Sequence, residues 1–150
     1  MGQIVSHKGV KVDPNKIKVM MDWPVPKTLK NLRGFLGLTG YYHKFVQNYG
    51  RIATPLTTLT KKDAFSWTLE ATQAFEQLKE AMCKAPVLTT PDFTKTFVVE
   101  CDALGNGIGV VLMQEGRPIS FESRPIKGND LHKPIYENEI LEILHALKQW

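Results

Sequence analysis

The sequence predicts an α+β fold in which a basic helical segment precedes a three-strand antiparallel meander with a helix packed on it. Helix caps and apolar residues at helical spacing recur over residues 13–84, and β-rich runs follow over residues 96–123. The charge divides along the same line. Residues 1–62 carry eleven Lys or Arg and two Asp, whereas residues 63–150 carry eight Lys or Arg and thirteen Asp or Glu. The resulting charges, +9 and −5, sum to the +4 of the whole chain and indicate two functional parts.

Capping residues mark where the first helices begin. After a hairpin over residues 3–12, Asp13 followed by Pro14 starts a short helix, and Thr28 caps the next one. Three glycines interrupt the apolar pattern after Thr28. Each costs about 1 kcal/mol relative to alanine inside a helix, so they indicate close helix packing or a bend. They are Gly34, Gly37 and Gly40.

Three more helices are expected before the β-rich region. One covers about residues 41–48, and a short one covers 52–59 with Pro55 near its first turn. The third is capped by Ser66 or Thr68 and runs to about residue 84.

The β-rich region predicts three strands joined in sequence order, with a hairpin turn at Glu115-Gly116. The expected strands are residues 96–102, 107–114 and 117–123. A last helix starts near Tyr136 and has no C-cap, glycine or proline before Trp150. A domain seldom stops inside an amphipathic helix, so we expect the chain to be truncated there.

Several classes of protein are disfavoured. No apolar run is long enough to cross a bilayer, and the start has no secretion-signal pattern, so no membrane partner is expected. Cys83 and Cys101 lie far apart without a CxxC motif or a histidine cluster. A disulfide framework or zinc site is therefore not expected, and a reducing compartment fits.

Two carboxylates are candidates for a metal site. Asp102 ends an apolar strand, where a charge is costly unless it is paired or metal-bound. Glu139 shares the inward helix face with Ile143 and Ala146. Two inward carboxylates can chelate Mg²⁺, and two such ions about 4 Å apart support phosphodiester hydrolysis. Spacing alone favours a simpler interpretation, in which Asp102 ends its strand in water and Glu139 lies at a helix edge.

Charge alone also leaves two interpretations of the basic half. It can hold phosphates through counterion release, or it can be a solvated face without a partner. Lys30 and Arg33, at helical spacing, are the better candidates for phosphate contacts. Of Tyr41 and Tyr42, either of which can stack on bases, one is expected to pack in the core and the other to be half exposed. Lys44 is a further phosphate candidate.

An ordered series of motifs runs along most of the chain: Trp23-Pro-Val-Pro-Lys, Leu32-Arg-Gly-Phe-Leu-Gly, Ile52-Ala-Thr-Pro-Leu, Ala85-Pro-Val-Leu, Cys101-Asp-Ala and Glu137-Asn-Glu-Ile-Leu. Together they resemble the reverse transcriptase of gypsy-type LTR retrotransposons. An ordered, nearly continuous series is far more specific than any one short motif.

The resemblance implies a division of the chain. Residues 1–12 look like the end of the palm hairpin, which holds the primer end, and residues 13–62 look like the thumb, which grips the duplex. Residues 63–95 look like a connector, and residues 96–150 like a truncated ribonuclease H-like domain. The implied fold is thus a thumb-like helical segment followed by a partial ribonuclease H-like fold.

The resemblance also implies a chemistry. Asp102 and Glu139 match catalytic carboxylates that hold Mg²⁺ in a two-metal site, and Arg124 is a candidate contact to the hybrid. The parent Pol polyprotein would make DNA from an RNA template and cleave RNA in RNA–DNA hybrids. Its implied partners are the hybrid or the template–primer duplex, together with the rest of the polyprotein. A cytoplasmic or nuclear location is expected for such a retroelement protein.

Departures from the family pattern leave other interpretations open. The chain has no Asp-Asp pair, Leu104 and Glu122 replace residues more common in the family, and the remaining ribonuclease H carboxylates are expected beyond Trp150. We therefore expect little or no activity from this chain alone. The alternatives are a non-catalytic nucleic-acid-binding protein derived from a retrotransposon and a decayed reading frame without function.

Overall fold

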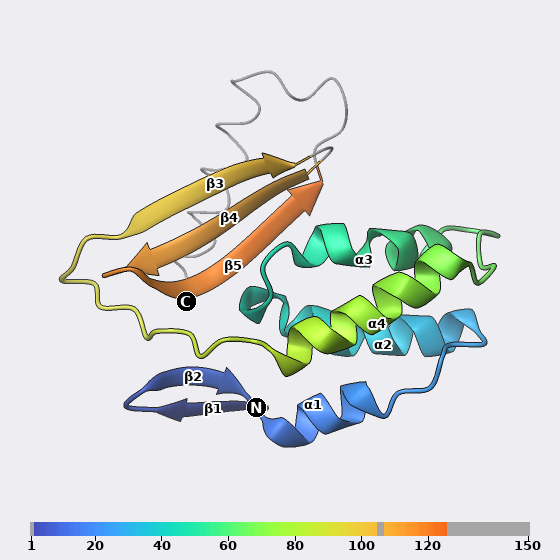
Figure 1. Ribbon diagram of the computed structural model, residues 1–150, viewed down its shortest axis with the longest axis horizontal. Helices are drawn as coiled ribbons and strands as arrows, with labels where there is room; N and C mark the ends of the chain where they lie inside the picture. Colours follow the sequence, from blue (N-terminus) through green and yellow to red (C-terminus); the bar gives the residue numbers. More distant parts are fainter. Residues whose placement is uncertain (1, 105–106, 126–150) are drawn as a thin grey trace.

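The computed structural model describes residues 2–104 and 107–125, so Glu139 and the expected last helix lie outside the described residues. A β-hairpin and the helices come first, and a three-stranded antiparallel sheet follows, which confirms the predicted α+β class (Figure 1). The elements are β1 (Gln3–Ser6), β2 (Gly9–Val12), α1 (Pro14–Met21), α2 (Leu29–Tyr41), η1 (His43–Phe45), α3 (Tyr49–Thr57), η2 (Thr58–Thr60), α4 (Leu69–Cys83), β3 (Val98–Leu104), β4 (Gly107–Gln114) and β5 (Arg117–Pro125).

Side-chain caps begin three of the helices where the sequence predicts them. The Asp13 carboxylate accepts from the backbone N–H of Asn15 at 2.9 Å, ahead of α1. Thr28 caps α2 in the same way, and Thr68 rather than Ser66 caps α4. Each cap satisfies one of the backbone donors that a helix N-terminus leaves without a partner.

Helix α2 corrects one expectation. It continues through all three glycines to Tyr41, and the helix expected over residues 41–48 is wrong. Only the 3-10 helix η1 follows, and its last residue, Phe45, is completely buried. Leu32 and Phe35 are fully buried on the inner side of α2, and this burial outweighs the cost of the glycines.

Helix α3 corrects another. It begins at Tyr49, not at residue 52, so Pro55 lies inside it rather than near its first turn. The earlier start depends on Asn48, whose φ of 61° is left-handed, a conformation that asparagine tolerates better than most residues. Ala53 and Leu56, on either side of Pro55 in the sequence, are buried. Their burial holds the helix against its neighbours.

Helices α2, α3 and α4 share a core that joins the expected thumb-like part to the expected connector. Phe35 of α2 and Phe75 of α4 are both fully buried, with ring centroids 4.6 Å apart. A second core joins the β1–β2 hairpin, α1 and η1 to the segment after α4. There, Val10 and Leu88 exchange two backbone hydrogen bonds of 2.7 Å. The next residue, Thr89, donates its N–H to the Pro118 carbonyl of β5 at 2.8 Å.

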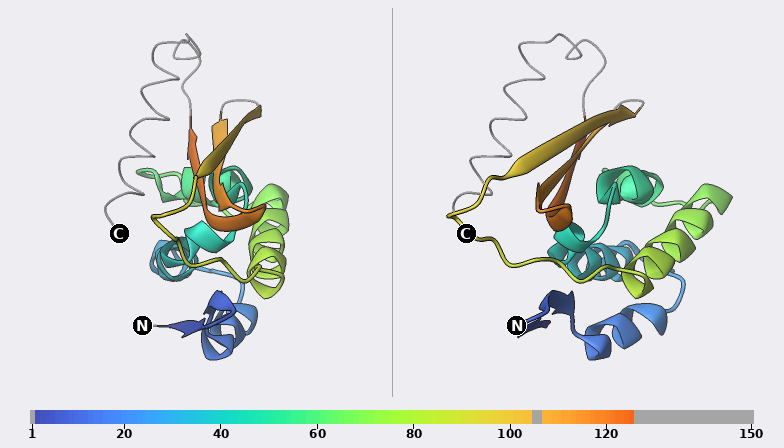
Figure 2. Two further views of the ribbon diagram at one scale, coloured as in Figure 1. Left: turned by 90° about the vertical axis from the view of Figure 1, so that its left-hand side faces the viewer. Right: turned by 60° about the vertical axis from the view of Figure 1, so that its left-hand side comes forward.

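The larger sheet has the order β3-β4-β5 and lies against α3 and η1 (Figure 2). Strand β4 has the predicted bounds and alternates half-buried and buried residues, and the turn at Glu115-Gly116 is confirmed. The first strand starts two residues later than expected, at Val98, and reaches Leu104. The third extends to Pro125 rather than to residue 123. Within residues 2–104 and 107–125, no helix has the length and apolar character needed to span a membrane.

Candidate functional site

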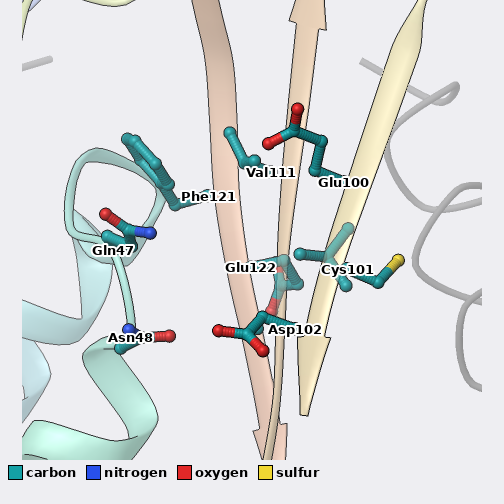
Figure 3. Close-up of a pocket in the computed structure, with 10 residues that line it drawn as sticks. Gln47, Asn48, Glu100, Cys101, Asp102, Val111, Phe121 and Glu122 are labelled. Atoms are coloured by element: carbon teal, nitrogen blue, oxygen red, sulfur yellow. The ribbon is translucent and has the colours of Figure 1, made fainter. Parts of the chain in front are cut away.

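A cleft of about 310 Å³ lies between the sheet and the loop that precedes α3 (Figure 3). One wall is the sheet, with residues from all three strands, and the other is Gln47 and Asn48. Asp102 lines this cleft, so the structure places the predicted carboxylate where the helical part meets the sheet.

The position of Asp102 follows from strand register. It pairs with Gly109, which pairs in turn with Ser123, and residues opposite one another in an antiparallel sheet point to the same face. Ser123 accepts a 2.8 Å hydrogen bond from the Gly50 N–H of α3, so this face is turned toward the helices. Asp102 is nevertheless exposed and lies two residues before the end of β3. Water therefore reaches this carboxylate, which agrees with the solvated placement that spacing alone favours.

A second carboxylate shares the cleft. Glu100 lies two residues before Asp102, and alternate residues of a strand point to the same side. Glu100 is also exposed, and Figure 3 shows it on the same wall of the cleft as Asp102. Carboxylate oxygens are the ligands that a hard divalent ion prefers. Within residues 2–104 and 107–125, however, no three His, Cys, Asp or Glu gather into a group able to hold a metal ion.

A third carboxylate, Glu122, is held by a histidine from the helical part. His43 approaches it at 3.1 Å through Nε2 and donates through Nδ1 to the Gly40 carbonyl at 2.9 Å. Both partners only accept hydrogen bonds, so the ring satisfies both when it is doubly protonated. The hydrogen bond to Glu122 accordingly raises the pKa of His43, while partial burial opposes the rise. This pair ties η1 to β5.

Most basic and aromatic candidates of the helical part lie on one side of α2. Lys30, Arg33, Gly37 and Tyr41 are all exposed and recur at three- and four-residue steps, which places them on one face of the helix. We call these four residues the α2 strip. Tyr41 is 59% exposed whereas Tyr42 is buried, so one tyrosine packs in the core as expected.

Within the described part of the chain, no contact or backbone angle requires glycine at the Gly37 position of the α2 strip. Among residues 2–104 and 107–125, a Cβ added at Gly37 would meet nothing within 4 Å, and the φ of Gly37 is not left-handed. By contrast, a Cβ at Gly34 would come within 3.1 Å of the Trp23 ring. The Gly37 position therefore gives up helix stability while keeping the backbone open to an approaching molecule.

The other two basic candidates are less accessible. Lys44 is half-buried, with its ammonium 5.4 Å from the centre of the Phe45 ring and 3.5 Å from the Gln3 side-chain oxygen. Burial lowers the pKa of Lys44. Arg124 is half-buried in β5, and its Nε is buried without a hydrogen-bond partner in the described part of the chain.

The contacts that shape the cleft were not predicted from the sequence. The sequence pattern predicts Asn48 only as the end of a helix, although an Asn shortly before a Gly is a recognisable signal for left-handed backbone. No local pattern links His43 to Glu122, because the two residues are 79 positions apart. The predicted residue Glu139 lies outside the described residues, and its pairing with Asp102 stays a prediction.

Comparison with known proteins shows which protein family the sheet side of this cleft matches. The family described as "RNase H-like domain found in reverse transcriptase" matches residues 67–150. The retrovirus-related Pol polyprotein from transposon 297 of Drosophila melanogaster is 44% identical over 150 residues, covering 99% of this chain and 14% of that protein. The chain thus spans about a seventh of the polyprotein it matches.

Two solved structures share the fold. One is the foamy viral protease-reverse transcriptase in complex with RNA/DNA hybrid, with a TM-score of 0.82 and 24% identity over 99% of this chain and 21% of that chain. The other is the same viral protein in complex with dsDNA, with a TM-score of 0.80 and 23% identity over 99% of this chain and 32% of that chain.

Proposed function

Because the chain belongs to the family of RNase H-like domains found in reverse transcriptases, we propose that it serves a retroelement Pol polyprotein in two ways. Its helical part grips an RNA–DNA hybrid or a template–primer duplex, and its sheet supplies part of the site that cleaves RNA in the hybrid. In this proposal residues 1–12 end the palm, 13–62 form the thumb, 63–95 connect, and 96–150 begin the ribonuclease H-like domain.

The α2 strip supports the grip. Lys30 and Arg33 are exposed cations one helical turn apart, suited to successive phosphates of a backbone. Gly37 lets that backbone approach the helix closely, and Tyr41 offers an aromatic face to a sugar or base. The excess of positive charge in residues 1–62 adds an attraction to nucleic acid that does not depend on the nucleotide sequence.

The placement of Asp102 is the observation that supports the proposed role in RNA cleavage. It is exposed, and it lines the cleft where helices and sheet meet, with Glu100 beside it. RNase H-like domains generally use divalent metal ions, and the oxygen donors of these residues fit Mg²⁺. We assign Asp102 and Glu139 as its ligands in a two-metal site, where the ions would activate water and stabilise the leaving oxygen. Arg124 is proposed to contact the hybrid near this site, and Lys44 to contact a phosphate from the helical part.

The grip is tested by measuring hybrid affinity against salt concentration. We expect the Lys30→Gln/Arg33→Gln double variant to lower the salt dependence of binding by about two ions released, one for each lost phosphate contact. The matched control is Lys84→Gln/Lys95→Gln, which removes two lysines outside the α2 strip. An equal loss of salt dependence in both double variants would contradict the assigned grip.

The Asp102 assignment is tested with Mn²⁺ as the probe. Paramagnetic broadening of the NMR signals of Gly109 and Val110 should occur in the wild type and disappear in Asp102→Asn. The control variant Glu76→Gln, an exposed carboxylate of α4, should broaden like the wild type. Unchanged broadening in Asp102→Asn would remove Asp102 from the metal site.

One observation favours a second function, non-catalytic binding, for the chain by itself. Glu122 is engaged by His43, and the described residues hold no group of three metal-binding side chains. We therefore expect salt-dependent hybrid binding with little or no Mg²⁺-dependent cleavage. Strong cleavage of a labelled hybrid that vanished in Asp102→Asn would show that the chain carries a complete site.

A further inference from the structure

We propose that Gln47 and Asn48 form a ribose-binding subsite, so that the helical part helps to select RNA over DNA at the Asp102 cleft. The two side-chain amides would hydrogen-bond 2′-hydroxyl groups of the RNA strand. The inference rests on the proposed function and extends it by naming which strand is read and by which residues.

The Asn48 amide is not used within the described structure. Asn48 occupies the N-cap position of α3, where asparagine usually accepts a hydrogen bond from the first turn of the helix. It makes no such capping bond, and neither Gln47 nor Asn48 has a side-chain hydrogen bond to another described residue. Instead, Figure 3 shows the Asn48 side chain pointing across the cleft toward Asp102.

The sheet is shaped to accept this side chain. A Cβ at Gly109 would lie 2.6 Å from the Asn48 Oδ1, so any residue larger than glycine would push the amide away. Gly109 is also the strand partner of Asp102. The amide therefore lies on the same part of the sheet as the carboxylate that the proposed function places at the scissile bond.

The chemistry of the cleft fits a sugar hydroxyl better than a phosphate. Among the described residues that line it there is no lysine or arginine, whereas Glu100, Asp102 and Glu122 are acidic. Such a lining repels a phosphate that no cation accompanies. An amide both donates and accepts hydrogen bonds, as a hydroxyl does, so the two are complementary. In a nucleic acid the 2′-hydroxyl is the group that distinguishes RNA from DNA.

The test compares two hybrids of one sequence, one with a natural RNA strand and one with a 2′-fluoro RNA strand. The fluoro sugar keeps the RNA-like pucker but cannot donate a hydrogen bond. Wild type should bind the natural hybrid about tenfold more tightly, the effect of about two ordinary hydrogen bonds between neutral groups. The Gln47→Ala/Asn48→Gly variant should bind both hybrids equally, at the wild-type affinity for the fluoro hybrid. Glycine is chosen at residue 48 because it accepts the left-handed φ of 61° without strain.

The outcomes separate this inference from the function on which it rests. If the wild type binds both hybrids equally, or if the variant keeps the tenfold preference, the ribose subsite is wrong while the nucleic-acid grip stands. If the wild type binds neither hybrid in a salt-dependent way, both are wrong. A melting temperature of the variant within about 2 °C of wild type, small for a chain of this length, would exclude misfolding as the cause of a lost preference.

Discussion

Replacing Gly37 by alanine should make the protein more stable and a weaker binder at the same time. In the part of the chain that the structure describes, nothing lies within 4 Å of the added methyl group, so the change meets no steric obstacle there. The gain is the difference in helix propensity, about 1 kcal/mol. For a chain of this length that corresponds to a rise in melting temperature of about 3 °C.

The loss of binding follows from the same open space. If a duplex backbone lies on the α2 strip, the methyl group occupies the position that Gly37 keeps free. We expect hybrid affinity, measured by fluorescence anisotropy at fixed salt, to fall about tenfold, because close backbone contacts do not tolerate an added carbon.

Gly40 provides the matched control on the same helix. A Cβ there would sit 3.5 Å from the Tyr49 hydroxyl, an ordinary contact on the side of α2 that faces the protein. Gly40→Ala should therefore keep the wild-type affinity. Equal affinities for wild type and Gly37→Ala would refute the placement of the duplex on the α2 strip, and a lower melting temperature for Gly37→Ala would refute the steric reasoning.

Two further predictions concern stability. His43→Gln should flatten the pH dependence of the melting temperature, because the pKa of His43 is raised in the folded state. The contribution of protonated His43 to folding stability is complete at pH values below the ordinary pKa near 6.5, and it is lost as the pH rises through the folded-state pKa. A melting profile of His43→Gln parallel to wild type above pH 6 would contradict this. Phe75→Ala, which empties a fully buried site, should cost about 3–5 kcal/mol in urea unfolding, and a loss below about 1 kcal/mol would show that the helical core does not depend on it.

Local chemistry explains which elements could be predicted from the sequence. Asp13, Thr28 and Thr68 each satisfy a backbone donor two or three residues away, so the helix starts are visible in the sequence. The alternation of β4 is equally local. The continuation of α2 past its glycines depends instead on burial of Leu32 and Phe35 against α3 and α4, which no short window contains.

The candidate site also has one part that could be predicted from the sequence and one part that could not. Asp102 was predicted from its strand pattern and from the family resemblance, and the structure adds that it is exposed in a cleft. The opposite wall of that cleft was not predicted. Asn48 is brought to Asp102 by the packing of α3 on the sheet, through the bond between Gly50 and Ser123, whose sequence separation is 73.

The two neighbours Leu88 and Thr89 link the N-terminal hairpin to the larger sheet through backbone hydrogen bonds. Leu88 pairs with Val10 near the start of the chain, and Thr89 bonds to Pro118 near the end of the described part. During synthesis on the ribosome, the N-terminal hairpin must wait for most of the helical region to emerge before its outer edge finds a partner. Thr89 must then wait for β5. The connection that Leu88 and Thr89 make between the helical part and the sheet is therefore completed in two steps, and the bond to the sheet forms last.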